Sequence, residues 1–242
     1  MRIFLAGASG AIGRRLVPLL LDAGHQVTGT TRHAETAKIL ERAGVAAAVV
    51  DVFDAATLAA AVVASQPAVV IHQLTDLPRA LDGARIAASA PGNARIRSEG
   101  TRNLVAAAQA AGAQRFIVQS IAFAYAPGDE PHPETDLLNL ADPARAVTVK
   151  GVADMEHQVL AASGMEGVVL RYGLLYGPGT WYETPDRRPA LHVDAAAQAA
   201  LLAVTRGGRG AYNIADDDGA VSIAKARAEL GFDPTLRSGQ RS

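Results

Sequence analysis

Three glycines spaced three residues apart, Gly7, Gly10 and Gly13, stand between a short apolar run and a segment of helical character. Glycine permits left-handed backbone angles, close approach of a phosphate and close packing of a helix on a strand. A turn of this kind at a helix N-terminus is suited to hold a pyrophosphate. The segment is therefore predicted to bind a dinucleotide through Gly7, Ser9, Gly10, Ala11, Ile12 and Gly13.

The residues after the next two apolar segments indicate which dinucleotide is favoured. Arg32 follows the strand predicted at 26–31, and no acidic residue stands in that run. An acid there would bind the adenosine ribose, whereas an arginine pairs with a 2′-phosphate. NADP(H) is therefore favoured over NAD(H), with a solvated surface arginine as the alternative. Asp51 and Val52, after the third strand, are predicted to lie beside the adenine, with an ordinary loop aspartate as the alternative.

Short apolar segments alternate with helix-length segments along the chain. Strands are predicted at 3–6, 26–31, 45–50, 68–72, 115–119 and 167–171, and helices at 14–23, 34–43, 55–65, 99–111 and 146–163. Apolar strands separated by helices are typical of a parallel sheet covered on both faces. This predicts a doubly wound α/β fold of the Rossmann type, whose ligands bind just beyond the strands. Gln73, directly after the fourth strand, is a cofactor-binding candidate for that reason.

Length and composition limit the classes of function. The 242 residues, 49% of them hydrophobic, are expected to form a single domain, 1–242. A net charge of −1 gives no electrostatic basis for binding nucleic acid or an anionic membrane surface. A small-molecule partner is expected instead.

The absence of certain residue types and segments excludes further classes. The chain has no cysteine, and its six histidines lack the spacing of metal ligands, so neither a disulfide framework nor a metal site is expected. No apolar stretch is long enough for a membrane span or a signal peptide. The protein is therefore expected to be soluble and cytoplasmic.

Several motifs occur together in an order that resembles the extended short-chain dehydrogenases/reductases, within them the NAD-dependent epimerase/dehydratase group. The motifs are Gly7-Ala8-Ser9-Gly10-Ala11-Ile12-Gly13, Asp51-Val52-Phe53-Asp54, Gly100-Thr101-Arg102-Asn103-Leu104, Leu170-Arg171-Tyr172-Gly173, Tyr176-Gly177-Pro178-Gly179 and His192-Val193-Asp194. The resemblance places Tyr172 and Gly173 at the nicotinamide pocket. It also implies a reduced C-terminal substrate lobe, with small lid segments at about 174–192 and 213–242, and by analogy a possible homodimer.

The chemistry of the resembling family rests on a Ser or Thr, a Tyr and a Lys, and this chain keeps that set only in part. Lys150 matches the lysine that holds the nicotinamide ribose, but Ala146 stands four residues earlier, where the family has its tyrosine. Ser120 lies one position from the family's hydroxyl residue. The candidates for the catalytic set are therefore Lys150, Ser120 and Tyr125, with Tyr125 or Lys150 as replacements for the missing phenol, and a strand-capping role as the alternative for Ser120.

These observations predict an NADP(H)-dependent oxidoreductase of the atypical short-chain type. It would transfer a hydride to or from a small carbonyl, enone or imine. Two alternatives stay open. One is a sugar-nucleotide epimerase or dehydratase, which the small lobe and the missing tyrosine disfavour. The other is a non-catalytic NAD(P)-binding regulatory sensor.

Overall fold

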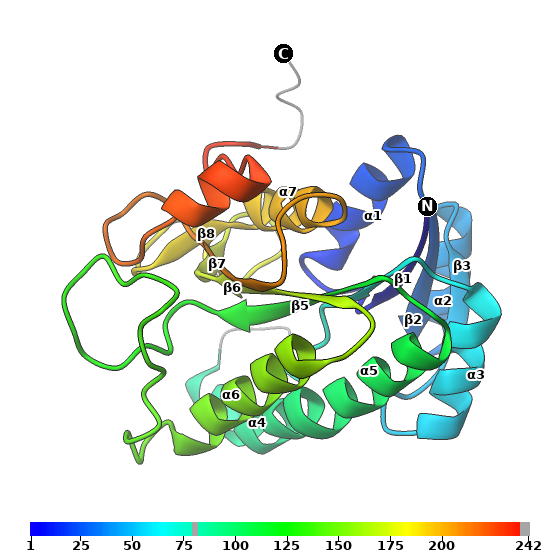
Figure 1. Ribbon diagram of the computed structural model, residues 1–242, viewed down its shortest axis with the longest axis horizontal. Coiled ribbons are helices and arrows are strands. Elements are labelled where there is room, and N and C mark those ends of the chain that lie inside the picture. Colours follow the sequence, from blue (N-terminus) through cyan, green and yellow to red (C-terminus); the bar gives the residue numbers. More distant parts are fainter. Residues whose placement is uncertain (79–81, 238–242) are drawn as a thin grey trace.

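The computed structural model describes residues 1–78 and 82–237, and a parallel β-sheet forms its centre (Figure 1). Within these residues, seven strands hydrogen-bond in parallel in the order β3-β2-β1-β4-β5-β6-β9. Their bounds are β1 Arg2–Ala6, β2 Gln26–Thr31, β3 Ala46–Val49, β4 Val69–His72, β5 Arg115–Ile121, β6 Glu166–Tyr172 and β9 Gly210–Ile214. The strand order reverses between β1 and β4, which places a binding crevice beyond the carboxyl ends of the strands. The predicted doubly wound fold is confirmed.

Helices cover both faces of this sheet (Figure 1). Side chains of α1 (Gly13–Asp22), α2 (Ala34–Arg42) and α7 (Val193–Ala203) enter the core on one face. Those of α3 (Ala55–Ser65), α5 (Thr101–Ala110) and α6 (Ala146–Ala161) enter the core on the other. Because apolar side chains alternate between the faces along each strand, two separate cores hold the strand ends in fixed positions.

The chain from β4 to α5 differs from the sequence-based expectation. Helix α4, Gly83–Arg95, was not predicted, because Pro91 and Gly92 in its interior are unfavourable in helices. Asp82 offsets part of that cost, since its carboxylate accepts hydrogen bonds from two backbone N–H groups of the first turn. A π-helical segment, η1 (Ile96–Gly100), joins α4 to α5, and α4 packs on α6.

A small layer adjoins the main sheet at its C-terminal side. Strand β7 (Leu174–Tyr176) pairs in parallel with β8 (Ala190–His192), and the π-helical segment η2 (Ala226–Leu230) packs near α7. These elements belong to the predicted lid segments 174–192 and 213–242. Residues 238–242 of the second segment lie outside the described residues.

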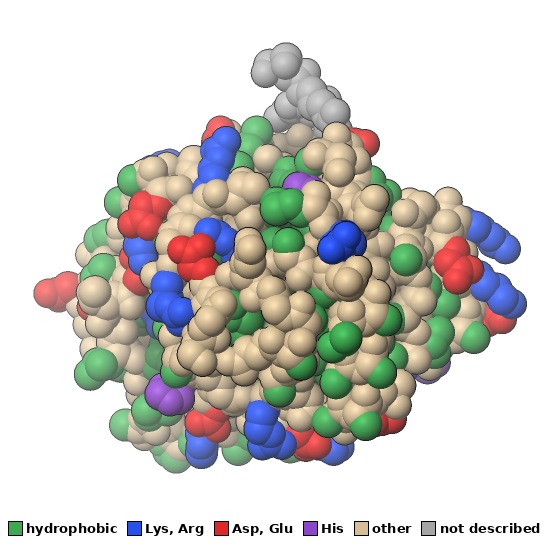
Figure 2. Space-filling model, turned by 45° about the vertical axis from the view of Figure 1, so that its right-hand side comes forward, with side chains coloured by type: hydrophobic (Ala, Val, Ile, Leu, Met, Phe, Trp, Pro, Cys, Tyr) green, Lys and Arg blue, Asp and Glu red, His purple; other side chains and the backbone are tan. Residues whose placement is uncertain are grey.

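The surface of the molecule carries mixed charge. On the face drawn in Figure 2, lysine and arginine side chains are interspersed with aspartate and glutamate. Among the described residues, no helix combines the length and apolar character needed to cross a membrane.

Candidate active site

The glycine turn after β1 has the backbone geometry that its sequence predicts. Gly7 has φ +96°, and a Cβ built on it would lie 2.8 Å from the backbone carbon and oxygen of Gln73. A Cβ on Gly13 would lie 2.2 Å from the carbonyl oxygen of Gly7. The Gly10 N–H donates to that same oxygen at 3.1 Å, and α1 begins at Gly13. Neighbouring backbone leaves no room for a side chain at Gly7 or Gly13, and the tight turn leads directly into the N-terminus of α1, the kind of site that binds a pyrophosphate.

Of the other turn residues, Ser9 and Gly10 are exposed at the tip, whereas Ile12 is buried in the core under α1. Ala11 lies between these two environments. The tip is therefore the part of the turn that is open to a ligand, and Ile12 anchors it. Binding of the dinucleotide by residues 7–13 stays a prediction, in which Ile12 would act through the shape of the turn and not through its side chain.

The residues predicted for the adenosine end lie together beyond β2 and β3. Arg32 is exposed immediately after β2. The Asp51 carboxylate accepts a hydrogen bond from the backbone N–H of Phe53 at 2.9 Å, and Val52 is buried, with its carbonyl bonded to the Asn103 amide. Strand β2 neighbours β1, and β3 neighbours β2, so these residues follow the glycine turn along one edge of the sheet.

Gln73, Tyr172 and Gly173 lie on the other side of the glycine turn. The Gln73 amide donates to the Tyr172 hydroxyl at 3.2 Å, and this bond connects the end of β4 with the end of β6. Burial raises the pKa of Tyr172, so its phenol stays protonated at neutral pH. A Cβ on Gly173 would lie 2.6 Å from the Ala190 carbonyl oxygen, because β8 approaches closely there.

A buried set of polar side chains crosses the ends of β5, β6 and β9. Ser120, Arg171 and Asn213 face each other in register on neighbouring strands. Glu156 from α6 and Tyr125 from the loop after β5 complete what we call the polar layer. Arg171 donates to the Glu156 carboxylate through Nε at 3.0 Å and through Nη2 at 2.6 Å.

Both predicted catalytic hydroxyls belong to this polar layer, and both are engaged in hydrogen bonds. Ser120 donates to Glu156 at 2.6 Å. Tyr125 donates to the Asn213 side-chain oxygen at 2.6 Å and accepts a hydrogen bond from Arg171 at 2.8 Å. Burial raises the pKa of Tyr125. The structure therefore brings Ser120 and Tyr125 together, with their protons directed at protein acceptors.

Lys150 does not join this group. Its side chain is 71% exposed, and its ammonium binds the Asp154 carboxylate at 2.8 Å. The buried residues of α6, Val149, Val152 and Met155, define its sheet-facing side. At 100° per residue, Lys150 lies on the opposite side of the helix from that apolar stripe. The geometry offers no support for the predicted ribose-binding and proton-transfer roles of Lys150.

Glu156, Arg171 and Asn213 are the site residues that sequence reasoning missed. One signal for them was readable, because Arg171 is the charged residue in the otherwise apolar strand predicted at 167–171. A buried arginine requires a buried acid, but its partner lies on another element. Sequence spacing alone could not identify that acid as Glu156.

Contacts between the N-terminal half and the lid segment 174–192 close the edge of the crevice. Arg15 on α1 donates to the Pro178 carbonyl at 2.9 Å and binds Asp194 at 3.2 Å. The Trp181 indole donates to the Pro78 carbonyl at 2.9 Å. The segment therefore connects the glycine-turn helix with the loop after β4.

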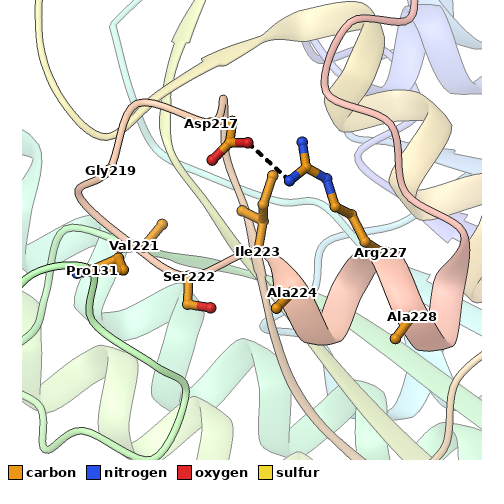
Figure 3. A pocket seen from close by; sticks show the side chains of 9 residues that line it. All are labelled: Pro131, Asp217, Gly219, Val221, Ser222, Ile223, Ala224, Arg227 and Ala228. Atoms are coloured by element: carbon orange, nitrogen blue, oxygen red, sulfur yellow. Dashed lines mark hydrogen bonds and ion pairs between the residues drawn. The ribbon is translucent and has the colours of Figure 1, made fainter.

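Two depressions lie on the C-terminal side of the described structure. The larger, about 540 Å³, runs along the 217–223 loop and η2, where Asp217 and Arg227 form an ion pair at 2.8 Å (Figure 3). The smaller, about 160 Å³, is lined by Ala122, Phe123 and Tyr125 directly after β5. Val221 lines both. The smaller depression is the one that borders the polar layer, so it is the better placed for a substrate.

A parallel sheet whose first strand leads through a glycine cradle into a helix defines an α/β dinucleotide-binding protein. The comparisons agree with this class. The chain belongs to the NAD(P)H-binding family, whose model matches residues 7–190.

Individual relatives support a narrower description. The 3-diazoavenalumate denitrifying reductase of Streptomyces sp is 42% identical over 232 residues, which cover 95% of this chain and 72% of that protein. This chain is therefore NAD(P)-binding and oxidoreductase-like.

Solved structures share the fold. UDP-glucose 4-epimerase of Thermotoga maritima has a TM-score of 0.78 and 18% identity, covering 98% of this chain and 94% of that one. The UDP-glucose 4-epimerase of Thermus thermophilus, solved with NAD, has a TM-score of 0.76 and 20% identity, covering 98% and 95%. The predicted resemblance to the epimerase/dehydratase group is confirmed at the level of fold.

Proposed function

We propose that this protein is a reductase that uses NADPH in preference to NADH and delivers hydride to a small organic electrophile. The observation that carries the proposal is the cradle formed by Gly7, Gly10 and Gly13. A turn of this kind at a helix N-terminus is suited to a pyrophosphate, and the remainder of a dinucleotide would then lie along the strand ends. A bound nicotinamide coenzyme would supply the hydride. The 42% identity to a reductase favours reduction over the other reactions of this fold.

The cofactor preference rests on Arg32. Its guanidinium is exposed just past β2, and within the described part of the chain no acidic side chain forms an ion pair with it. It is therefore available to bind a 2′-phosphate.

The hydrogen bonds of the Ser120 and Tyr125 hydroxyls favour a substrate whose reduction needs no proton from the protein. Reduction of a carbonyl needs a proton as well as a hydride, yet Ser120 and Tyr125 direct their protons at Glu156 and Asn213. Replacement of an arenediazonium group by hydrogen needs one hydride and no net proton, because the carbon–nitrogen bond breaks and N₂ leaves. We therefore favour a diazo compound as substrate, in agreement with the name of the Streptomyces relative.

Turnover of a deuterium-labelled coenzyme tests this function. The protein is incubated with a benzenediazonium salt and NADPH that carries deuterium on one face of the nicotinamide at a time. A reductase should transfer deuterium to the arene from only one of the two labelled forms of NADPH. The reaction without protein should transfer deuterium from both forms. Carbonyl, enone and imine compounds form the rest of the panel. Binding of NADPH with no turnover of any compound would instead favour a sensor, and interconversion of UDP-sugars an epimerase.

The NADPH preference is tested separately with Arg32→Ala. Loss of a charged hydrogen bond to phosphate should weaken NADPH binding about 10- to 100-fold and leave NADH binding unchanged. Arg42→Ala, at the exposed end of α2, is the matched control. Equal affinities of wild type and Arg32→Ala for NADPH would refute the assignment.

A further inference from the structure

Arg97 on η1 is a partly buried cation that the protein itself does not pair. Burial lowers the pKa of Arg97 to about 10, so its guanidinium is still charged at neutral pH. Across residues 1–78 and 82–237, no side chain or carbonyl forms a hydrogen bond or close ion pair with this group. The π-helical segment that carries it interrupts the α4–α5 helix, and such segments occur frequently at functional sites.

Glu156 is the acid whose charge acts on Arg97, but its carboxylate is already engaged. One oxygen accepts from Ser120 and from Arg171 Nε, and the other accepts from Arg171 Nη2. The charges of Glu156 and Arg171 cancel within the polar layer. Arg97 is therefore left without a carboxylate of its own, and an anion bound beside it would neutralise its charge.

His72, the last residue of β4, adds a second donor. The ring is 1% exposed, and its Nδ1 accepts a hydrogen bond from the Leu74 backbone N–H at 3.2 Å. Burial, and then the positive charge of Arg97, lowers the pKa of His72 to about 3, so the ring is neutral. A neutral ring that accepts at Nδ1 carries its hydrogen on Nε2. In the described structure, that Nε2 is buried and has no acceptor.

The Arg97 guanidinium and the Nε2–H of His72 are neighbouring hydrogen-bond donors without an acceptor, and Arg97 is positively charged. Such a pair of donors is suited to bind the two oxygens of a carboxylate. The charged groups of the coenzyme have other positions, since the pyrophosphate belongs to the glycine turn and the 2′-phosphate to Arg32. Both lie at β1 and β2, whereas the segment of Arg97 packs on α6, and the charge of Arg97 acts on His72 at the end of β4. An anion at Arg97 must then come from the substrate.

We propose that Arg97, assisted by the Nε2–H of His72, binds a carboxylate of the substrate. The protein would then be a reductase of small organic acids. This inference rests on the function proposed above and narrows its substrate class to anionic compounds. Arg97 selects the substrate in this proposal and takes no part in hydride transfer.

Paired probes test the inference. Turnover of 4-carboxybenzenediazonium is compared with that of benzenediazonium, in wild type and in Arg97→Gln. The wild type should favour the carboxylated probe about 10- to 100-fold in kcat/KM, the range of a charged hydrogen bond. Arg97→Gln should lose that preference, so that its kcat/KM values for the two probes become similar. Arg97→Lys should retain part of it, and Arg102→Gln, exposed on the adjacent α5, should retain all of it.

Calorimetry with benzoate gives a readout that does not depend on turnover. Benzoate should bind the NADP⁺-loaded wild type and bind Arg97→Gln at least about tenfold more weakly, with NADPH affinity equal in both. Equal benzoate binding, or no binding to the wild type, would overturn the proposal. Weaker binding of NADPH by Arg97→Gln, with benzoate binding unchanged, would also overturn it. If no probe is turned over, the proposed reductase function fails while the benzoate measurement still decides the role of Arg97.

Discussion

Glu156 on α6 and Arg171 on β6 form a two-point ion pair in which both side chains are less than 10% exposed. The pair joins a helix to the sheet directly below the strand ends. It also fixes the two hydroxyls of the site, because Ser120 binds the acid and Tyr125 binds the arginine. The positions of these hydroxyl groups therefore depend on this one pair.

Glu156→Gln should be strongly destabilising. The variant leaves the buried Arg171 charge without its counter-charge, and breaking a buried ion pair from one side costs about 3–5 kcal/mol. Urea denaturation gives the free energy of unfolding. Glu99→Gln, which breaks the surface pair with Arg95, is the control and should change it little. Similar values for the two variants would mean that the buried pair does not hold α6 to the sheet.

Alanine substitutions in the glycine turn should separate folding from binding. Gly13→Ala places a Cβ 2.2 Å from a carbonyl oxygen and should lower both stability and NADPH binding. Gly10→Ala places its Cβ at 3.4 Å from the nearest atom outside its neighbours, which is an ordinary contact. It should leave the melting temperature near that of wild type and weaken NADPH, because the methyl group occupies the approach of the phosphate. If Gly10→Ala binds NADPH normally, the pyrophosphate does not lie at this turn.

Tyr125→Phe should affect stability more than catalysis. The variant removes a hydroxyl that Arg171 and Asn213 both use, at a cost of about 1–2 kcal/mol. A general acid contributes about 100- to 10,000-fold to a rate, so a decrease of that size in kcat would show that Tyr125 transfers the proton after all. Steady-state kinetics on the best substrate distinguishes the two outcomes. Tyr182→Phe, in the lid segment, is the matched control.

Lys150→Ala should retain wild-type turnover and NADPH affinity. The lysine lies on the outer side of α6, and its ion pair is with Asp154, one turn further along the same helix. Lys38→Ala, which removes a comparable surface pair with Glu35, serves as the control. A loss of NADPH affinity specific to Lys150→Ala would restore the ribose-binding role predicted from the sequence.

His72 should make the fold sensitive to acid. The pKa of His72 is about 3 in the folded protein and about 6.5 in the unfolded chain. Between these pH values the unfolded chain binds a proton at His72 and the folded protein does not. The contribution to stability is thus present above pH 6.5 and is lost as the pH falls toward 3. When the pH is lowered from 7 to 4, the free energy of unfolding of His72→Asn should fall by about 3 kcal/mol less than that of wild type. Urea denaturation at each pH measures it. His157→Asn, on the exposed side of α6, is the matched control.

The sequence was sufficient for the sheet and the glycine turn, because these depend on local patterns. Apolar strands and the Gly7–Gly13 spacing are readable without knowing what packs where. The polar layer was not readable, since Glu156, Arg171 and Asn213 meet only through sheet register and helix packing.

Lys150 illustrates a different limit. The four-residue spacing from Ala146 placed it at the family position, but the apolar stripe Val149, Val152 and Met155 fixes the rotation of α6 and turns Lys150 outward. That stripe is visible in the sequence, so helix periodicity could have shown the orientation of Lys150 where motif spacing did not.

The in-register row Ser120, Arg171 and Asn213 has a consequence for the diversification of this fold. Its members lie on the neighbouring strands β5, β6 and β9, and Glu156 of α6 binds two of them. The smaller depression, in contrast, is formed by connecting segments. Exchange of segment 177–189 with that of relatives should therefore yield chains with new substrate ranges on an unchanged polar layer. Segment 126–145 is less suitable for exchange, because its His132 and Glu134 bind Asn213 and Arg171. The same arrangement makes this molecule a suitable starting scaffold for loop-grafting libraries.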